Sequence, residues 1–456
     1  MKLFKIDFET QYKYLVYKTK PYSFYKVPNL FYTASKTKIG FMIHLIKISI
    51  LLTSCLLLSN QLTGQSLIDL LADAKGNNLT LKILEKEYYA ALEKAPQVSQ
   101  LPDPEVGLSA FLLPVETRLG PQIFRVGATQ MLPWKGILST KKDLELAKAK
   151  AIYERIAVQE LELTYQIKKA WLQLYEIQQS QLIIQRNLQL LESLDKLALA
   201  KVESGKTTGA DVLMVQLKKE ELLQELAILK RAEAKPLTTI NQLLNRPLET
   251  EIVVRDSLSF AQIPYHKDSL MANIQGNHPM IRMYALQQEV AKKSLDLSQL
   301  DSKPDFGIGL DYIMTNRLAN SNFENNGRDV FIPRVSVKIP IYKKKYGAKE
   351  REEQLKIEAL ETQKLDLVSQ YLAKIDKAMT DYEMARLKVD LYHKQMTITQ
   401  SAITILETDY STRGNSFDEL LQLEKELIAY DLKLLKAIVQ SHQAKINIER
   451  YLVINE

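Results

Sequence analysis

The stretch PDFGIGLDYIM, at positions 304–314, decides the fold class of this chain. Large apolar side chains alternate with Gly and Asp, so that Phe306 and Ile308 fall on one face of an extended strand and Gly307 falls on the other. Successive side chains of a β-strand point to opposite faces. The stretch therefore predicts a strand with one apolar face and one polar face.

Three further segments show the same alternation. Val335 and Val337 alternate with polar residues in one of them, and Phe124 and Val126 do so in another. Pro133 closes the segment that begins at residue 122 and matches Pro340 in the last segment, and Pro commonly ends strands. The four predicted strands cover residues 105–113, 122–132, 305–314 and 330–341.

The strands belong to two similar halves of the chain. Pro104-Glu105-Val106-Gly107 matches Pro304-Asp305-Phe306-Gly307, and Gly205 matches Gly414 later in each half. A repeat of this length predicts two copies of one structural unit. Each copy is predicted to contain a helix, two strands, a long helix and a further helix, in that order. The predicted organisation is a leader and signal peptide over 1–64, a first repeat over 65–245, a linker over 246–265 and a second repeat over 266–456.

Very long helices follow the strand pairs. Residues 138–202 contain neither Pro nor Gly, the residues that most often interrupt helices. At a rise of 1.5 Å per residue, such a helix would be about 100 Å long. A second long helix is predicted over 347–410. Shorter helices are expected over 66–95, 210–245, 266–300 and 416–454, the last with the 3–4 spacing of a coiled-coil seam.

The first 64 residues differ from the rest in charge and hydropathy. They carry nine Lys and two acids, which accounts for the formal net charge of +7, so the remainder is neutral and predicts no nucleic-acid partner. The apolar run 48–58 has the length of a signal-peptide core, with cleavage expected near Gly64. Cys55, the only cysteine, lies in this run, so the mature chain would hold no disulfide. Lipidation of Cys55 and a start at Met42 remain alternatives.

Four amphipathic strands suit a transmembrane β-barrel, whose strands alternate between lipid and lumen. A sheet that spans a bilayer must close on itself, because no backbone group can be left unpaired in lipid. Four strands cannot enclose a pore, whereas three copies would supply twelve. If the strands span, the strand count requires an oligomer; the alternative is a soluble β-meander packed on a helical bundle.

The plan of the chain resembles the TolC family of outer-membrane efflux proteins over roughly residues 67–452. The segments LPDP at 101–104, PVETRLGPQ at 114–122 and QMLPWKG at 130–136 are similar to its Bacteroidetes branch and to its CusC-like heavy-metal efflux group. The resemblance implies a homotrimer with a twelve-stranded β-barrel in the outer membrane, continued by a periplasmic α-barrel of twelve helices. It also implies a passive duct that a periplasmic membrane-fusion adaptor and an inner-membrane pump, of RND or ABC type, supply with small molecules or metal ions.

In that family the helix-hairpin tips form the gate and dock the adaptor. These tips correspond to Val202, Glu203, Ser204 and Gly205 in the first half and to Arg413, Gly414 and Asn415 in the second. An Asp that lines the family's entrance corresponds to Asp418, and three such carboxylates would attract cations. Family members often carry a second acid one turn on, where this chain has Leu421, which weakens the expectation of cation selectivity. Asp418 could equally be an acid that stabilises a helix N-terminus, with Ser416 as the N-cap.

No pattern of an enzyme is found in the sequence. Residues 200–207 fit a relaxed phosphate-loop pattern, but a long helix precedes them where a strand is required. His278 lies near Met280 and Met283, yet Met at helical spacing more often fills a core than binds a metal. We therefore expect no catalytic, cofactor-binding or metal-ligating residues. A periplasmic coiled-coil adaptor or structural protein of an export complex is the second interpretation; an adaptor would carry one hairpin rather than two.

Overall fold

The computed structural model describes residues 66–264, 267–320, 322, 324–413 and 417–452. The predicted leader with Cys55, and the tip residues Gly414, Asn415 and Ser416, lie outside the described residues. Among the helices that are described, none combines the length and the apolar character needed to cross a membrane.

A single antiparallel sheet contains four strands, β1 (Glu105–Val115), β2 (Gln122–Leu132), β3 (Asp305–Thr315) and β4 (Val330–Lys338). Their spatial order is β1-β2-β3-β4, so the two halves of the chain meet where β2 pairs with β3. Strands β1 and β4 form the two edges. An edge strand of this length presents a row of backbone groups able to pair with another strand.

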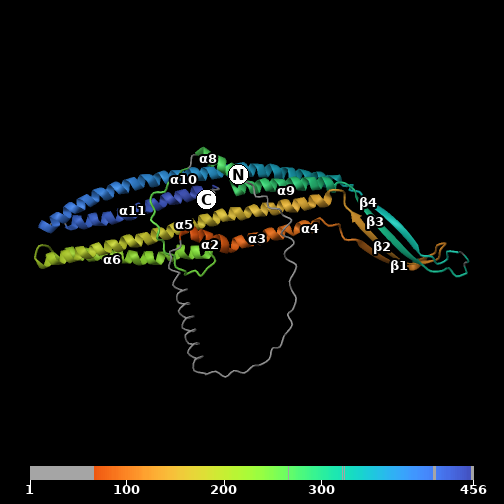
Figure 1. Ribbon diagram of the computed structural model, residues 1–456, viewed down its shortest axis with the longest axis horizontal. Helices are drawn as coiled ribbons and strands as arrows, with labels where there is room; N and C mark the ends of the chain where they lie inside the picture. The colour runs from red at the N-terminus through yellow and green to blue at the C-terminus, as the bar shows by residue number, and fades with distance from the viewer. Residues whose placement is uncertain (1–65, 265–266, 321, 323, 414–416, 453–456) are drawn as a thin grey trace, which may run out of the picture. The chain divides into compact units, whose positions relative to one another are not determined.

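The helices are drawn in chain order from orange to blue in Figure 1. The first half contains three short helices, a 67-residue helix and two further helices. The second half contains two helices before its strands and two after them, of which the first has 71 residues. Their bounds are α2 (Leu67–Asn77), α3 (Leu79–Leu92), α4 (Lys94–Val98), α5 (Ile137–Glu203), α6 (Gly209–Ala232), α7 (Ala234–Leu243), α8 (Lys267–Asn277), α9 (Pro279–Asp301), α10 (Lys343–Arg413) and α11 (Phe417–Glu449).

Several predicted boundaries were wrong for identifiable reasons. The predicted helix 66–95 is interrupted at Asn78, whose side chain accepts a hydrogen bond from the Leu81 amide and so begins a new helix. His278 performs the same role in the second half, where its ring nitrogen accepts from the Met280 amide. Strand β4 ends at Lys338 rather than at 341, shortly before Pro340, which has no amide hydrogen to donate.

Each strand continues into a helix, and the helices keep the order of the strands. Near the sheet, α5 lies between α3 and α9, and α9 lies between α5 and α10. Further from the sheet, α6 contacts α5, α5 contacts α11, and α11 contacts α10. The outer helices of this four-helix layer are therefore α6 and α10 at the hairpin end, just as β1 and β4 are the outer strands.

Two smaller hydrophobic clusters pack on α10, and the two larger ones lie along α5. One contains Leu163, Ile167 and Trp171, together with Leu70 from α2 and Val439 from α11. The other gathers residues of α5, α6, α10 and α11 near the hairpin end, among them Ile184, Leu191, Leu222, Ile403 and Tyr410. Because α5 contributes to both clusters, it links the middle of the helical layer to the hairpin end.

Candidate functional site

The first hairpin end is a well-formed turn after α5. The Gly205 amide donates to the Val202 carbonyl and the Lys206 amide donates to the Lys201 carbonyl, at 3.0 and 2.9 Å. This pair of bonds is the Schellman arrangement, which needs a left-handed residue after the helix. Gly205 supplies it with φ = +67°. The predicted tip residues Glu203, Ser204 and Gly205 are exposed and Val202 is half-buried.

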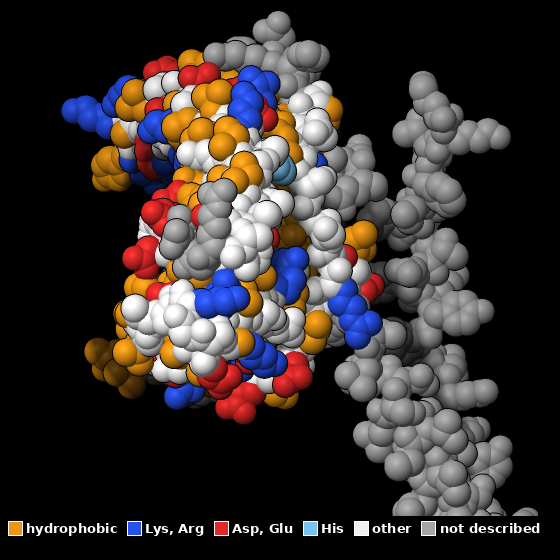
Figure 2. All heavy atoms as spheres, turned by 90° about the vertical axis from the view of Figure 1, so that its left-hand side faces the viewer, with side chains coloured by type: hydrophobic (Ala, Val, Ile, Leu, Met, Phe, Trp, Pro, Cys, Tyr) orange, Lys and Arg blue, Asp and Glu red, His pale blue; other side chains and the backbone are white. Residues whose placement is uncertain are grey.

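The second hairpin end joins α10 to α11. Arg413 is the last residue of α10, and α11 begins at Phe417, which is buried and packs against Tyr410 with ring centroids 4.8 Å apart. Asp418 lies in the first turn of α11 and is exposed. This position fits both interpretations of the residue, a helix N-terminal acid and an entrance-lining charge. In the view onto the hairpin end, acidic, basic and hydrophobic side chains are interspersed (Figure 2).

Lys201 connects the two hairpin ends. Its Nζ donates to the carbonyl oxygens of Tyr410 and Ser411, at 2.5 and 3.3 Å, and lies 4.7 Å from the centre of the Tyr410 ring. Both Lys201 and Tyr410 are buried. Burial raises the pKa of the Tyr410 phenol to about 12, with a further contribution from the charge of Asp211. The sequence prediction missed this pair, although a Lys in the last turn of one hairpin and a Tyr just before the break of the other were visible.

The sheet exposes its apolar face and buries its polar face, which is the reverse of a soluble sheet. Its apolar face is exposed in the isolated protomer: Phe306, Ile308, Val335 and Val337 are 42, 52, 76 and 49% exposed. Phe124 and Val126 of β2 share this face and are half-buried. The opposite face carries Gly307 and Asp311 of β3, both buried, where a soluble sheet would place its apolar core.

Charged residues cluster on this polar face. The buried Asp311 carboxylate lies 2.6 Å from one guanidinium nitrogen of Arg125 and 3.9 Å from one of Arg334. Arg334 of β4 also reaches across β3 and donates to the Thr129 hydroxyl on β2. The alternation pattern placed these residues on one face, but their mutual contacts depend on the strand register and could not be predicted.

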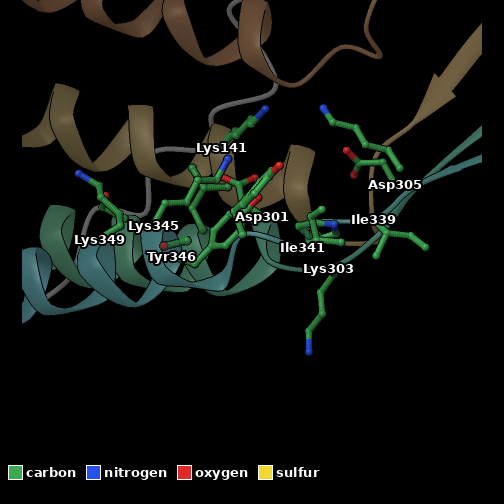
Figure 3. A pocket seen from close by; sticks show the side chains of 15 residues that line it. Lys141, Asp301, Lys303, Asp305, Ile339, Ile341, Lys345, Tyr346 and Lys349 are labelled. Carbon is green, nitrogen blue, oxygen red and sulfur yellow. The ribbon is translucent and has the colours of Figure 1, made fainter.

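A cavity of about 790 Å³ lies where the sheet meets the helices (Figure 3). Residues of α5, α9, β4 and α10 line it, including five lysines and two aspartates. Lysine ammonium groups of such a lining can hold an anion. The charged residues are Lys141, Asp301, Lys303, Asp305, Lys338, Lys345 and Lys349.

The segments considered for other chemistry have structural roles in the described chain. Residues 200–207 are the end of α5 and its turn, with no strand before them. His278 is buried, and its ring packs in a tilted arrangement against Tyr371 with ring centroids 4.7 Å apart. Burial is the main cause that lowers its pKa to about 4, and Arg282 adds to it. Within the described residues, no group of three or more His, Cys, Asp or Glu could hold a metal ion.

Comparison with solved structures finds close matches in fold. A membrane protein of Pseudomonas aeruginosa matches with a TM-score of 0.67 and 13% identity, over 84% of this chain and 89% of its own. The outer-membrane protein VceC of Vibrio cholerae matches with 0.65 and 13%, over 84% and 95%. The channel protein CusC matches with 0.64 and 15%, over 86% and 95%.

No protein-family model matches the sequence, and no curated protein matches it. At 13–15% identity, the structural similarity establishes the shared fold. The sheet-and-long-helix architecture described above is thus the one seen in solved bacterial outer-membrane channels, and this chain has the fold of the TolC-type outer-membrane channel proteins.

Proposed function

We propose that this protein is the outer-membrane channel subunit of a tripartite efflux or type I secretion system. Three copies would form a passive duct, with a twelve-stranded β-barrel in the outer membrane and a twelve-helix α-barrel in the periplasm. A periplasmic membrane-fusion adaptor and an inner-membrane pump, of RND or ABC type, would supply cargo and energy. The two halves of the chain would be copies of one unit, with boundaries at 65–245, 246–265 and 266–456.

The exposed apolar face of the sheet is the observation that carries this proposal. Apolar side chains such as Phe306 and Val335 are exposed, whereas Asp311 and Gly307 on the opposite face are buried. In water this arrangement would expose apolar surface at a free-energy cost of about 25 cal/mol per Å². In a bilayer the same face would contact lipid and the polar face would line a lumen.

The free edges of the protomer support the homotrimer. Among the described residues, the edge strands β1 and β4 have no strand partner on one side. The two outer helices carry exposed apolar residues at helical spacing, which are Leu213, Leu217 and Ile228 on α6 and Leu387, Leu391, Ile398 and Ile405 on α10. Pairing β4 of one copy with β1 of the next, and α10 with α6, would cover both edges at once. Three such protomers would supply twelve strands, which can close into a barrel.

The hairpin ends are proposed to dock the adaptor and to form the entrance. The residues assigned to docking are Val202, Glu203, Ser204, Gly205, Arg413, Gly414 and Asn415. Asp418 is exposed beside them and would form a ring of three carboxylates at the mouth. Such a ring attracts cations and repels anions where the passage is narrow.

The experiment combines native mass spectrometry with single-channel recording of the detergent-solubilised full chain in planar bilayers. We expect a trimer and defined current steps. A monomer that neither conducts nor partitions into membranes would refute the duct and favour the alternative of a periplasmic coiled-coil adaptor. The solved structures compared above are membrane or channel proteins, and an adaptor would carry one helical hairpin rather than the two seen with this four-stranded sheet.

A further inference from the structure

We propose that the cavity where the sheet meets the helices binds the headgroup of a zwitterionic phospholipid, in which a phosphate lies next to a primary amine. Lys141 and Lys345 would hold the phosphate, and Asp301 would hold the amine. The inference rests on the proposed function, because it requires the junction of the sheet and the helices to lie at the periplasmic surface of the outer membrane.

Opposite charges line this cavity of about 790 Å³, yet among the described residues they form no ion pairs with one another within 4 Å. Three lysines act electrostatically on the carboxyl group of Asp301. They come from α5, β4 and α10 and are Lys141, Lys338 and Lys345. A ligand that carries one charge of each sign could therefore complete contacts on both sides of the cavity. Such a ligand has no net charge, so the site needs no excess of lysines.

The remaining charged groups of the lining are engaged elsewhere or point away. Lys349 lies 2.7 Å from the buried carboxylate of Glu353. Asp305 Oδ1 accepts a hydrogen bond from the Trp134 amide at 3.2 Å, which holds this carboxylate at the end of the sheet. In Figure 3 the Lys303 side chain points away from the other labelled side chains. The headgroup site therefore consists of Lys141, Asp301 and Lys345.

Two helix ends meet at the cavity and carry partial charges of opposite sign. The 71-residue helix α10 begins at Lys343, so Lys345 and Lys349 line the cavity from its first two turns. The 23-residue helix α9 ends at Asp301. A helix N-terminus favours anions, and a helix C-terminus favours cations. The phosphate is therefore expected beside the start of α10, and the amine beside the end of α9.

The rim of the cavity toward the sheet is apolar. Ile339 and Ile341 line the cavity and are 64 and 68% exposed. They continue the alternation of Val335 and Val337, whose face is proposed to contact lipid. Tyr342 is 77% exposed at the same rim, and aromatic residues gather at the interfaces of membrane barrels. The acyl chains would thus lie along the apolar face while the headgroup enters the cavity.

The test counts the phospholipids bound to the full chain, which is purified in detergent, stripped of lipid and titrated with dioleoyl phosphatidylethanolamine. Native mass spectrometry reports the bound lipid and the trimer mass in one spectrum. Lys141→Gln and Lys345→Gln should each weaken binding about fivefold, as expected for one lysine near a membrane surface. Lys364→Gln is the matched control, because it removes a lysine of α10 that pairs with Glu361 outside the cavity.

Asp301→Asn separates the two ends of the headgroup. It should weaken the binding of phosphatidylethanolamine. The binding of phosphatidylglycerol, which has the phosphate without the amine, should be unchanged or stronger. Equal weakening of both lipids would show that Asp301 acts through the structure of the junction, and would overturn the proposal.

Inorganic phosphate distinguishes a lipid site from a site for free phosphate. Ile341→Ser should weaken lipid binding, because it removes a contact of the acyl chains with the apolar rim. Sodium phosphate at the same concentration as the lipid should not displace it, because phosphate alone makes no contact with that rim. Displacement by phosphate, together with no effect of Ile341→Ser, would overturn the assignment to a lipid.

The outcomes also separate this inference from the proposed function. A chain that gives no current in planar bilayers refutes the duct, whereas loss of lipid binding in Lys345→Gln would still support the headgroup site. A conducting trimer whose lipid binding is unchanged in Lys141→Gln, Lys345→Gln and Asp301→Asn overturns the headgroup site and leaves the duct standing.

Discussion

The ammonium group of Lys201 donates a hydrogen bond to the backbone carbonyl of Tyr410, a residue 209 positions further along the chain. The bond joins the end of α5 to the end of α10, so it fixes the two helical hairpins to each other at their tips. The ring of Tyr410 lies beneath the same ammonium group and packs against Phe417 at the start of α11. Three helix ends therefore meet around one buried lysine.

Removing this contact should loosen the hairpin end. Hydrogen bonds to charged groups contribute about 1.5–3 kcal/mol, so Lys201→Ala should destabilise the closed arrangement of the tips by a similar amount. We expect longer or more frequent openings in single-channel recordings, with trimer assembly preserved. The control is Lys206→Ala, which removes an exposed lysine five residues on. Equal open probabilities for Lys201→Ala and wild type would show that the contact does not restrain the tips.

The space between Gly127 and Asp311 should not tolerate a methyl group. In Gly127→Ala the new Cβ would overlap with the Asp311 carboxylate and would push it away from Arg125. Overpacking of this kind costs about 1–3 kcal/mol. We expect a lower thermal unfolding temperature of the detergent-solubilised protein. Gly107 pairs with Gly127 across the sheet, and a methyl group there would meet no neighbour within 4 Å, so Gly107→Ala should be nearly neutral. Equal losses in both variants would contradict the steric argument.

Asp418→Ala should weaken the attraction of cations at the entrance. Asp418 is exposed in the first turn of α11, so its removal should not leave a buried group unpaired. The measurement is the conductance for potassium at low ionic strength, where screening is weak and the Debye length is about 30 Å at 0.01 M. We expect a reduced current relative to wild type. Asp366→Ala removes an exposed acid of α10 and should change nothing. A loss of thermal stability without a change in current would favour the helix-terminus role of Asp418.

The local patterns in the sequence predicted the elements that depend only on neighbouring residues. Strand β2 was predicted with its observed bounds, and the helix predicted over 138–202 differs from α5 by one residue at each end. Alternation and the lack of Pro and Gly are properties of the segment itself. The interruptions at Asn78 and Glu233 were missed. The second follows from Pro236, which has no amide hydrogen to bond to the Ala232 carbonyl, so it could have been predicted. The first depends on the side-chain cap of Asn78, which the local pattern does not reveal.

The candidate site could be predicted in position but not in contacts. Gly205 was placed at a hairpin end because a break follows the long helix, and Asp418 was placed by the resemblance to the TolC family. The bond between Lys201 and Tyr410 joins residues of different halves, and the charges around Asp311 meet only in one strand register. Such contacts follow from the tertiary arrangement, which periodicity alone does not determine.

Glu424 should make stability depend on pH. Its side chain is buried, and burial, together with the charge of Glu407, raises its pKa from 4.5 to about 7. The carboxyl group therefore has a pKa of about 7 in the folded state and 4.5 in the unfolded state, so the folded state binds the proton more tightly. The free energy of unfolding is greatest below about pH 4.5 and falls as the pH rises to about 7. Glu424→Gln should abolish this part of the pH dependence and stabilise the protein above pH 7 by on the order of 2 kcal/mol.

Thermal unfolding at several pH values tests this expectation. Glu419→Gln changes an exposed acid on the same helix and should keep the wild-type pH profile. Glu407→Gln should shift the fall in stability toward lower pH, since it removes the second cause of the raised pKa. A Glu424→Gln variant with the wild-type profile would mean that Glu424 is ionised in the folded state across this range.

The two tryptophans allow the membrane position of the sheet to be measured. Trp134 follows β2, is 36% exposed and stacks on Phe306 with ring centroids 6.0 Å apart. Trp171 is 2% exposed in the helical core, about 50 Å along α5 from its start. Aromatic residues at the ends of barrel strands lie at the membrane interface. We therefore expect brominated lipids to quench the fluorescence of Trp134 but not that of Trp171.

Single-tryptophan variants separate the two signals. Trp171→Phe leaves only Trp134, and it also removes a buried indole N–H that has no hydrogen-bond partner among the described residues, so the fold should be retained. Trp134→Phe leaves only Trp171 and is the matched control. Quenching confined to Trp171→Phe would support insertion of the sheet. Absence of quenching in both variants, in vesicles that retain the protein, would place the Trp134 end of the sheet outside the bilayer, because bromine quenches only at short range.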